Sequence, residues 1–188
     1  MAYSVQDASA HILARGAPLG VEHVPLRAAL GRVLAEDILS PVEQPPWNNS
    51  SMDGYAVRAA DVVSATVDSP VRLRVAGTIR AGQPAAQSLP PASAIRIMTG
   101  APIPEGANSV IRVEDTDAGE TIVAIRDARD VERNIRPRGE DLRVGDIAVA
   151  RSTTIGAAQL GVLASVGCAS VPVHRRPRVA VLTSGDEL

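Results

Sequence analysis

The sequence predicts a mainly β, α+β fragment: an elongated mixed α/β lobe, an inserted small domain resembling a β-barrel, and the first strand of a truncated α/β domain. Short alternating strands separated by Gly- and Pro-rich turns fill the middle of the chain. Segments with helical periodicity lie on either side of them. A continuous apolar run near the C-terminus is typical of a strand in a parallel sheet.

The first 44 residues predict a helix and short extended segments. Ser4 is a suitable N-cap with Asp7 in the first turn, and Gly16 ends the helical pattern. Residues 21–26 are expected to be extended, and a turn closed by Gly31 follows. Residues 32–38 fit a helix or a strand. We predict a strand, because Pro41 and a long loop come soon after it.

The middle of the chain predicts β structure. Val71, Leu73 and Val75 alternate with two arginines, which is typical of a half-buried strand. Further short strands are predicted over 95–98 and 109–113, and a hairpin turn at 117–120 leads into a strand over 121–125. Together these strands predict a small barrel or sandwich of about ninety residues.

The last third returns to mixed structure. Thr153 or Thr154 is expected to cap a helix that carries an apolar face and ends at Gly167. Strands are predicted over 169–173 and 178–182. We therefore predict a discontinuous linker and dimerisation lobe (1–44 and 145–175), an inserted β domain (45–144) and the start of an α/β domain (176–188). One parallel strand cannot bury both faces alone, so we expect a fragment cut at a domain start.

Length and composition indicate a globular chain. The 188 residues suit one large or two small domains, and 45% hydrophobic with 21% charged residues argues against disorder. No apolar run reaches the roughly 18 residues of a membrane span, and residues 1–4 lack the features of a secretion leader. We therefore expect a cytoplasmic protein with no membrane partner.

The residue types that are missing exclude several kinds of site. All 19 basic residues are arginine, which excludes a P-loop lysine and a Schiff-base lysine. Few aromatic residues and a net charge of −2 argue against a nucleic-acid partner. A lone cysteine, Cys168, and three widely spaced histidines exclude an internal disulfide and offer no zinc-site spacing.

Polar residues concentrate in four Gly- or Pro-rich loops, over residues 48–54, 98–107, 134–141 and 183–187. Each loop alone has a structural explanation. Asp53-Gly54 is a common turn pair, and Arg136 to Asp141 could form a solvated ion-pair surface. Asp186-Glu187 could cap a following helix.

Together the four loops closely resemble the MoeA and gephyrin E-domain family of molybdopterin molybdenumtransferases. The matching segments are Pro46–Val57, Arg96–Ala107 with Glu114–Thr116, Asn134–Asp141 and Arg178–Leu188. They occur in family order over nearly the whole chain, but cover only about the first half of a family member. The chain departs from the family pattern at Trp47, at Pro137 and in the order Thr183-Ser184.

The resemblance implies an enzyme that inserts molybdate into adenylylated molybdopterin and releases AMP, with a Mg²⁺ ion. It implies Asp53, Thr99, Asp141 and Glu187 as catalytic residues, with the three carboxylates as metal ligands. Ser50, Gly100, Arg136 and Arg138 are the expected cofactor-binding residues. Family members are dimers with a site shared between subunits. In them the pterin pocket lies in a third domain of which this chain carries only the start, so the fragment alone is expected to be inactive.

The chemistry of the substrates agrees with these residue types. A diphosphate and an oxyanion are both negative, so carboxylates fit such a site only around a hard cation. We expect a homodimer, and a molybdopterin adenylyltransferase as a second partner. Two alternatives stay open: a scaffold domain that binds peptides, as the gephyrin resemblance allows, or a small arginine-lined barrel that binds an anion.

Overall fold

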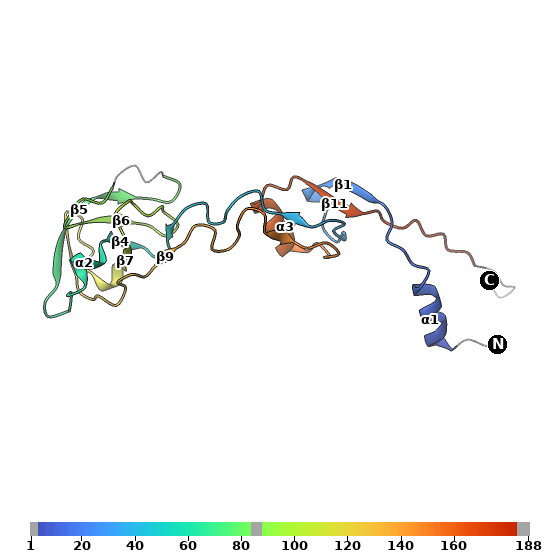
Figure 1. Ribbon diagram of the computed structural model, residues 1–188, viewed down its shortest axis with the longest axis horizontal. Coiled ribbons are helices and arrows are strands. Elements are labelled where there is room, and N and C mark those ends of the chain that lie inside the picture. The colour runs from blue at the N-terminus through green and yellow to red at the C-terminus, as the bar shows by residue number, and fades with distance from the viewer. Residues whose placement is uncertain (1–3, 84–87, 184–188) are drawn as a thin grey trace. The chain divides into compact units, whose positions relative to one another are not determined.

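The computed structural model describes residues 4–83 and 88–183 (Figure 1). Glu187 and the rest of its loop beyond Thr183 therefore lie outside the described residues. The chain divides into two compact units: unit 1 comprises Met1–Pro41 and Gly145–Leu188, and unit 2 comprises Val42–Val144. In the described ranges, no helix has both the length and the apolar character needed to cross a bilayer.

Unit 1 begins with the predicted helix, α1 (Val5–Leu13). The Ser4 hydroxyl accepts a hydrogen bond from the Asp7 backbone N–H at 3.1 Å, which confirms the predicted cap. None of the helix residues is buried within the chain. Local capping, and not packing, is what specifies this helix.

The core of unit 1 lies where two strand pairs meet α3 (Ala157–Ser165). Strand β1 (Val21–Pro25) pairs antiparallel with β11 (Ser170–His174), and β2 (Ile38–Leu39) pairs with β10 (Ile147–Val149). The short 3-10 helix η1 (Leu26–Ala28) follows β1. Leu163 of α3 and Val171 and Val173 of β11 are fully buried here. They pack with Leu34 and Ile155, which lie outside the named strands and helices.

Two predictions for unit 1 were wrong in detail. The strand expected over 32–38 is reduced to β2, because Val33 and Leu34 form single bridges to two different partners, Thr154 and Val173. The cap of α3 is Gly156, and neither Thr153 nor Thr154 takes that role. The Gly156 N–H donates to the Gln159 side chain at 3.0 Å, so the helix begins later than predicted.

The strand expected over 178–182 is absent. Residues 175–183 form neither helix nor strand, and Val179, Val181 and Leu182 are exposed. A strand needs a neighbour to satisfy its backbone groups. Within the described residues this apolar segment has no neighbouring strand to pair with, so its sequence pattern alone does not produce the element.

Unit 2 is built on one mixed sheet with the strand order β7-β4-β6-β5-β8, curled into half a barrel (Figure 1). Only the β5–β6 pair is parallel. The strands are β4 (Gly54–Val57), β5 (Val71–Ile79), β6 (Ser93–Ile97), β7 (Ser109–Arg112) and β8 (Ile122–Ile125). The short pair β3 (Asn49–Ser50) and β9 (Ile135–Arg136), the helix α2 (Ala59–Val62) and the 3-10 helix η2 (Val113–Asp115) complete the unit.

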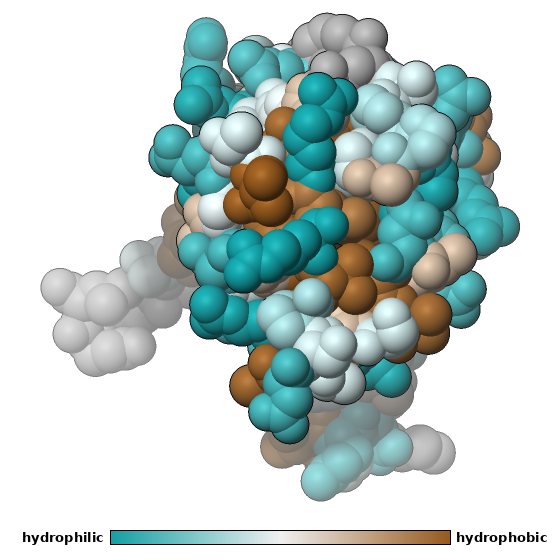
Figure 2. Space-filling view, turned by 90° about the vertical axis from the view of Figure 1, so that its left-hand side faces the viewer, coloured by the Kyte–Doolittle hydropathy of each residue, from teal (hydrophilic) through white to brown (hydrophobic). Residues whose placement is uncertain are grey.

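Apolar residues form a band across the middle of the face of unit 2 in Figure 2, with hydrophilic side chains over and around it. The large apolar residues exposed in this unit include Trp47, Val63, Val67 and Ile122.

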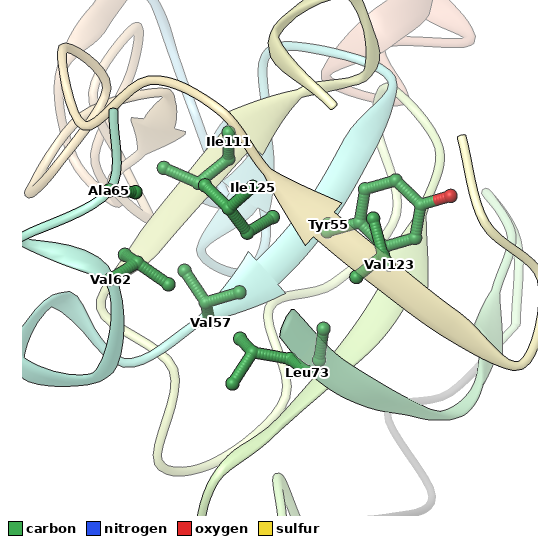
Figure 3. Packing of buried hydrophobic residues seen from close by; sticks show 9 residues of the cluster. Tyr55, Val57, Val62, Ala65, Leu73, Ile111, Val123 and Ile125 are labelled. Atoms are coloured by element: carbon green, nitrogen blue, oxygen red, sulfur yellow. The ribbon is translucent and has the colours of Figure 1, made fainter. Parts of the chain in front are cut away.

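The two faces of the sheet bury two separate clusters. Tyr55, Val57, Leu73 and Val123 pack with α2 on one face, and Figure 3 shows this cluster. Ala56, Ile79, Ile95, Ile97 and Val110 belong to the other. Tyr55 lies at the end of the first cluster, and its hydroxyl donates to the Gly119 carbonyl at 2.9 Å.

The strands predicted near 71–75, 95–98 and 109–113 are confirmed as β5, β6 and β7. The strand expected over 121–125 is β8, which pairs with β5. The tight hairpin turn predicted at 117–120 does not form: Thr116 makes a single bridge to Ile125, which encloses residues 117–124. The inner strand β4 was missed. Its four residues directly follow a run of turn-forming residues, so the sequence pattern predicted a loop there and not a strand.

Candidate functional site

Asp53 and Thr99 are held together by two hydrogen bonds. The backbone N–H and the hydroxyl of Thr99 both donate to Oδ1 of Asp53, each at 2.7 Å. These two bonds hold the pKa of the Asp53 carboxyl below its ordinary value, and the nearby positive charge of Arg96 acts in the same direction. Asp53 is therefore an exposed carboxylate that stays ionised at neutral pH.

The sheet explains why these two residues meet. Strands β4 and β6 are antiparallel neighbours, with Gly54 opposite Ile97. Asp53 comes directly before β4 and Thr99 comes two residues after β6, so the pairing brings both to one end of the sheet. Gly54 is required there, because a Cβ at this position would lie 2.0 Å from the Ile111 carbonyl oxygen in β7.

The loop that contains Ser50 is joined to the loop of Thr99. The Gly100 N–H donates to the Ser50 carbonyl at 2.8 Å, and the Ser50 N–H donates to the Ala101 carbonyl at 3.0 Å. Gly100 has a φ of +80°, which a residue with a side chain rarely adopts. The Ser50 hydroxyl is buried and donates to the Met52 carbonyl at 2.6 Å. This places Ser50 in the support of the Asp53 loop, and its contact with a cofactor stays a prediction.

The third polar loop joins the same group through β9. Asn49 and Ser50 in β3 pair with Arg136 and Ile135 in β9. The Arg138 N–H also donates to Oδ1 of Asn48 at 2.8 Å. Three of the four loops noted in the sequence, 48–54, 98–107 and 134–141, therefore lie side by side in unit 2.

The charged residues of the third loop pair with one another. Arg136 contacts Asp141 at 3.2 Å and Glu140 at 3.6 Å, and about half of each side chain is exposed. Arg138 pairs with Glu43. This is the solvated ion-pair arrangement that the sequence left open, and such exposed pairs stabilise a fold by roughly 0–1 kcal/mol. Neither guanidinium is buried, so an anionic ligand can exchange with the carboxylates.

Sequence comparison identifies the family. The MoeA N-terminal region (domain I and II) matches residues 3–167, which is most of the chain. The chain belongs to the MoeA family. This family is involved in molybdenum cofactor biosynthesis, and the resemblance predicted from the four loops is confirmed.

Several relatives of this MoeA-family chain are named as enzymes. Molybdopterin molybdenumtransferase 2 of Mycobacterium tuberculosis is 45% identical over 165 residues, which are 88% of this chain and 41% of that protein. The molybdopterin molybdenumtransferase of Haemophilus influenzae is 40% identical over 91% of this chain and 41% of that protein. The chain thus spans about two fifths of the length of these relatives.

A solved structure has a similar fold. The molybdopterin biosynthesis MoeA protein of Pyrococcus horikoshii superimposes with a TM-score of 0.75 and 34% sequence identity. The match covers 94% of this chain and 45% of that structure. The MoeA-type fold of mixed α/β structure, mostly strands, is therefore shown for this chain.

The predicted magnesium ligands are only partly described. Among residues 4–83 and 88–183, no group of three or more His, Cys, Asp or Glu side chains is arranged to hold a metal ion. Glu187 lies outside this part of the chain. Asp53 fits a Mg²⁺ ligand, since it is ionised and exposed and only its Oδ1 is engaged by Thr99. Asp141 is exposed and pairs with Arg136, so a cation and that guanidinium would share its oxygens.

Two residues, one next to these loops and one within them, were not selected as site residues from the sequence. Arg96 influences the charge state of Asp53, although it was noted only as part of a motif. Asn49 is buried, and its side-chain oxygen accepts no hydrogen bond from the described residues. An unpaired buried acceptor costs about 1–3 kcal/mol, so this oxygen calls for a water molecule or ligand donor. Its place within the polar loop over 48–54 was the signal in the sequence.

Proposed function

We propose that this chain supplies the N-terminal part of a molybdopterin molybdenumtransferase, in which molybdate is inserted into adenylylated molybdopterin and AMP is released. The observation that carries the proposal is the meeting of three polar loops around the Asp53–Thr99 pair. The names of the M. tuberculosis and H. influenzae relatives support the same activity.

Each of the three loops has a distinct part in this proposal. Thr99 orients Asp53 and keeps it ionised, through the two hydrogen bonds to Oδ1. Gly100, with its positive φ, lets the backbone turn next to Thr99. Backbone N–H groups in such a turn can bind an anionic group. Arg136 and Arg138 supply guanidinium groups that can bind phosphate oxygens in place of their present carboxylate partners.

We propose that Asp53 and Asp141, with Glu187, bind a Mg²⁺ ion. Bound there, the ion supplies charge neutralisation for a diphosphate and polarises it for displacement. The carboxylates themselves provide oxygen ligands that such a hard cation prefers. Without the ion, their negative charge would repel both substrates.

The family resemblance also supports proposals on assembly. We propose a homodimer with its site shared between subunits, substrate delivery by a molybdopterin adenylyltransferase partner, and a cytoplasmic location. We further propose that residues 1–44 and 145–175 form the linker and dimerisation lobe and that 45–144 form the inserted domain. Light scattering after size-exclusion chromatography would show the dimer as twice the chain mass.

A chimera tests the activity directly. Residues 1–188 would replace the matching N-terminal part of the M. tuberculosis relative, and AMP release from adenylylated molybdopterin would be measured with molybdate present. We expect activity in the chimera, and a loss of about 100-fold with Asp53→Asn, since a metal ligand contributes several kcal/mol of charge stabilisation.

The matched control is Asp68→Asn, which neutralises an exposed carboxylate of unit 2 outside the three loops. We expect this variant to keep the activity of the chimera. A folded chimera with no AMP release, or equal losses in both variants, would contradict the proposal.

A further inference from the structure

Unit 2 contains a cavity that none of the predicted site residues lines. Its volume is about 480 Å³, and its lining residues are Thr78, Arg80, Arg96, Met98 and Glu120. Small-molecule sites typically have volumes of about 300–1,000 Å³. Two guanidinium groups face one carboxylate in this lining, so the cavity carries a net positive charge at neutral pH.

An irregularity in β5 builds this cavity. Val75 lies opposite Ala94 in β6, but the next pair is Thr78 opposite Arg96, so β5 has one residue more than β6 between these positions. Such a bulge reverses which face the following side chains occupy. Ile79 therefore packs in the cluster opposite that of Leu73, and Thr78 and Arg80 turn to the face of Arg96. The bulge is what brings the two arginines together.

Within the described residues, neither the Arg80 nor the Arg96 side chain forms an ion pair or a hydrogen bond, although Arg112, Arg129, Arg136 and Arg138 all do. Arg96 is only partly exposed and sits on a central strand. Two unpaired guanidiniums lining one cavity are suited to the oxygens of a phosphate group.

The cavity adjoins the loops described above. Met98 lines it, and the next residue, Thr99, donates both of its hydrogen bonds to Asp53. The thioether side chain of Met98 offers an apolar, adaptable surface beside the charged groups. The volume and this apolar wall favour a ligand larger than a bare oxyanion.

We propose that this cavity binds a phosphate monoester, with Arg80 and Arg96 bound to its phosphate oxygens and Met98 against its organic part. Thr78 offers a hydroxyl donor to the phosphate, and Glu120 an acceptor for hydroxyl groups of the ligand. AMP, which the proposed reaction releases, is such a monoester, so the inference rests on the proposed function in naming its ligand class. The test measures binding alone, so loss of AMP binding in a chain that still supports activity in the chimera would overturn the cavity and not the proposed function.

Isothermal titration calorimetry of the 188-residue chain tests this site, with AMP as the phosphate monoester. We expect saturable binding of AMP and no binding of adenosine, which lacks the phosphate. Arg96→Gln and Arg80→Gln should each raise the Kd of AMP about tenfold, as expected for one lost charge-assisted contact. The matched control is Arg74→Gln, which removes an exposed guanidinium outside the cavity, from β5, the strand that ends just before Arg80.

Inorganic phosphate and molybdate separate the ligand classes in the same experiment. We expect both to bind more weakly than AMP, because neither has an organic part to contact Met98. Molybdate binding without AMP binding, or equal losses in all three arginine variants, would overturn the proposal. Circular dichroism establishes that each variant is folded, and exposed Arg80 gives a variant that leaves the core intact even if Arg96→Gln destabilises it.

Discussion

Arg112 and Asp130 form a bidentate ion pair in unit 2. The Nε and Nη2 atoms of Arg112 donate to the two carboxylate oxygens of Asp130, each at 2.9 Å. The Arg112 backbone N–H adds a third bond to Oδ2 at 3.2 Å, and Asp130 is only 1% exposed. The pair fastens β7, an outer strand of the sheet, to the segment that follows β8.

The stability of unit 2 is expected to fall in acid through this pair. The hydrogen bonds from Arg112 lower the pKa of Asp130 from 3.8 to about 2. Because the folded state has the lower pKa, the stabilisation is present above pH 4 and is lost as the pH falls towards 2. A shift of this size corresponds to about 2 kcal/mol of unfolding free energy. Urea denaturation at a series of pH values measures it.

Asp130→Asn removes the charge, so the unfolding free energy should no longer fall between pH 4 and pH 2 through this residue. At pH 7 the same variant should be less stable by about 2 kcal/mol. Asp127→Asn is the control, since Asp127 pairs with Arg129 on the exposed part of the same segment. The idea fails if the two variants show the same dependence of stability on pH.

Thr99→Val is expected to raise the pKa of Asp53 towards its ordinary value. The substitution removes the hydroxyl donor and leaves the backbone donor in place, so only part of the shift should disappear. A carboxyl-detected NMR titration of Asp53 measures the change. Thr99→Ser keeps the hydroxyl and serves as control, and a pKa of Asp53 that stays the same in Thr99→Val would show that the hydroxyl bond is not responsible.

The sequence predicted the elements that local chemistry specifies. Ser4 with Asp7 defined α1, and the alternation around Leu73 defined β5. It failed where the outcome depended on distant partners. Tyr55 and its neighbours form the inner strand β4 only because β6 and β7 lie on either side. Val179 forms no strand, since no strand of the described residues pairs with its segment.

The same distinction holds for the site. Asp53, Thr99 and Asp141 could be named because they belong to motifs that resemble a family, and the structure places their loops together. Arg80 could not be selected, because a bulge between Val75 and Thr78 decides which face it occupies. The pairing of Arg112 with Asp130, 18 residues away, likewise depends on the fold and not on a sequence motif.

Asp141→Asn is expected to leave the fold intact and to reduce the activity of the chimera. Its contact with Arg136 at 3.2 Å lies at the exposed surface, so the unfolding free energy should change by less than about 1 kcal/mol. AMP release should fall strongly if the carboxylate binds the metal. Denaturation and AMP release are measured on the same variant, and full activity at limiting Mg²⁺ would remove Asp141 from the proposed metal ligands.

Gly54→Ala and Gly161→Ala should have opposite effects on stability. At position 54 the added Cβ would lie 2.0 Å from the Ile111 carbonyl oxygen, so β4 and β7 cannot keep their present distance. We expect a loss of about 3 kcal/mol or more in unfolding free energy, and with it the Asp53–Thr99 geometry. At position 161, within α3, no atom lies within 4 Å of the added Cβ, so alanine should stabilise the helix by about 0.5–1 kcal/mol. Urea denaturation measures both changes, and a Gly54→Ala variant as stable as the parent chain would contradict the close approach of β4 to β7.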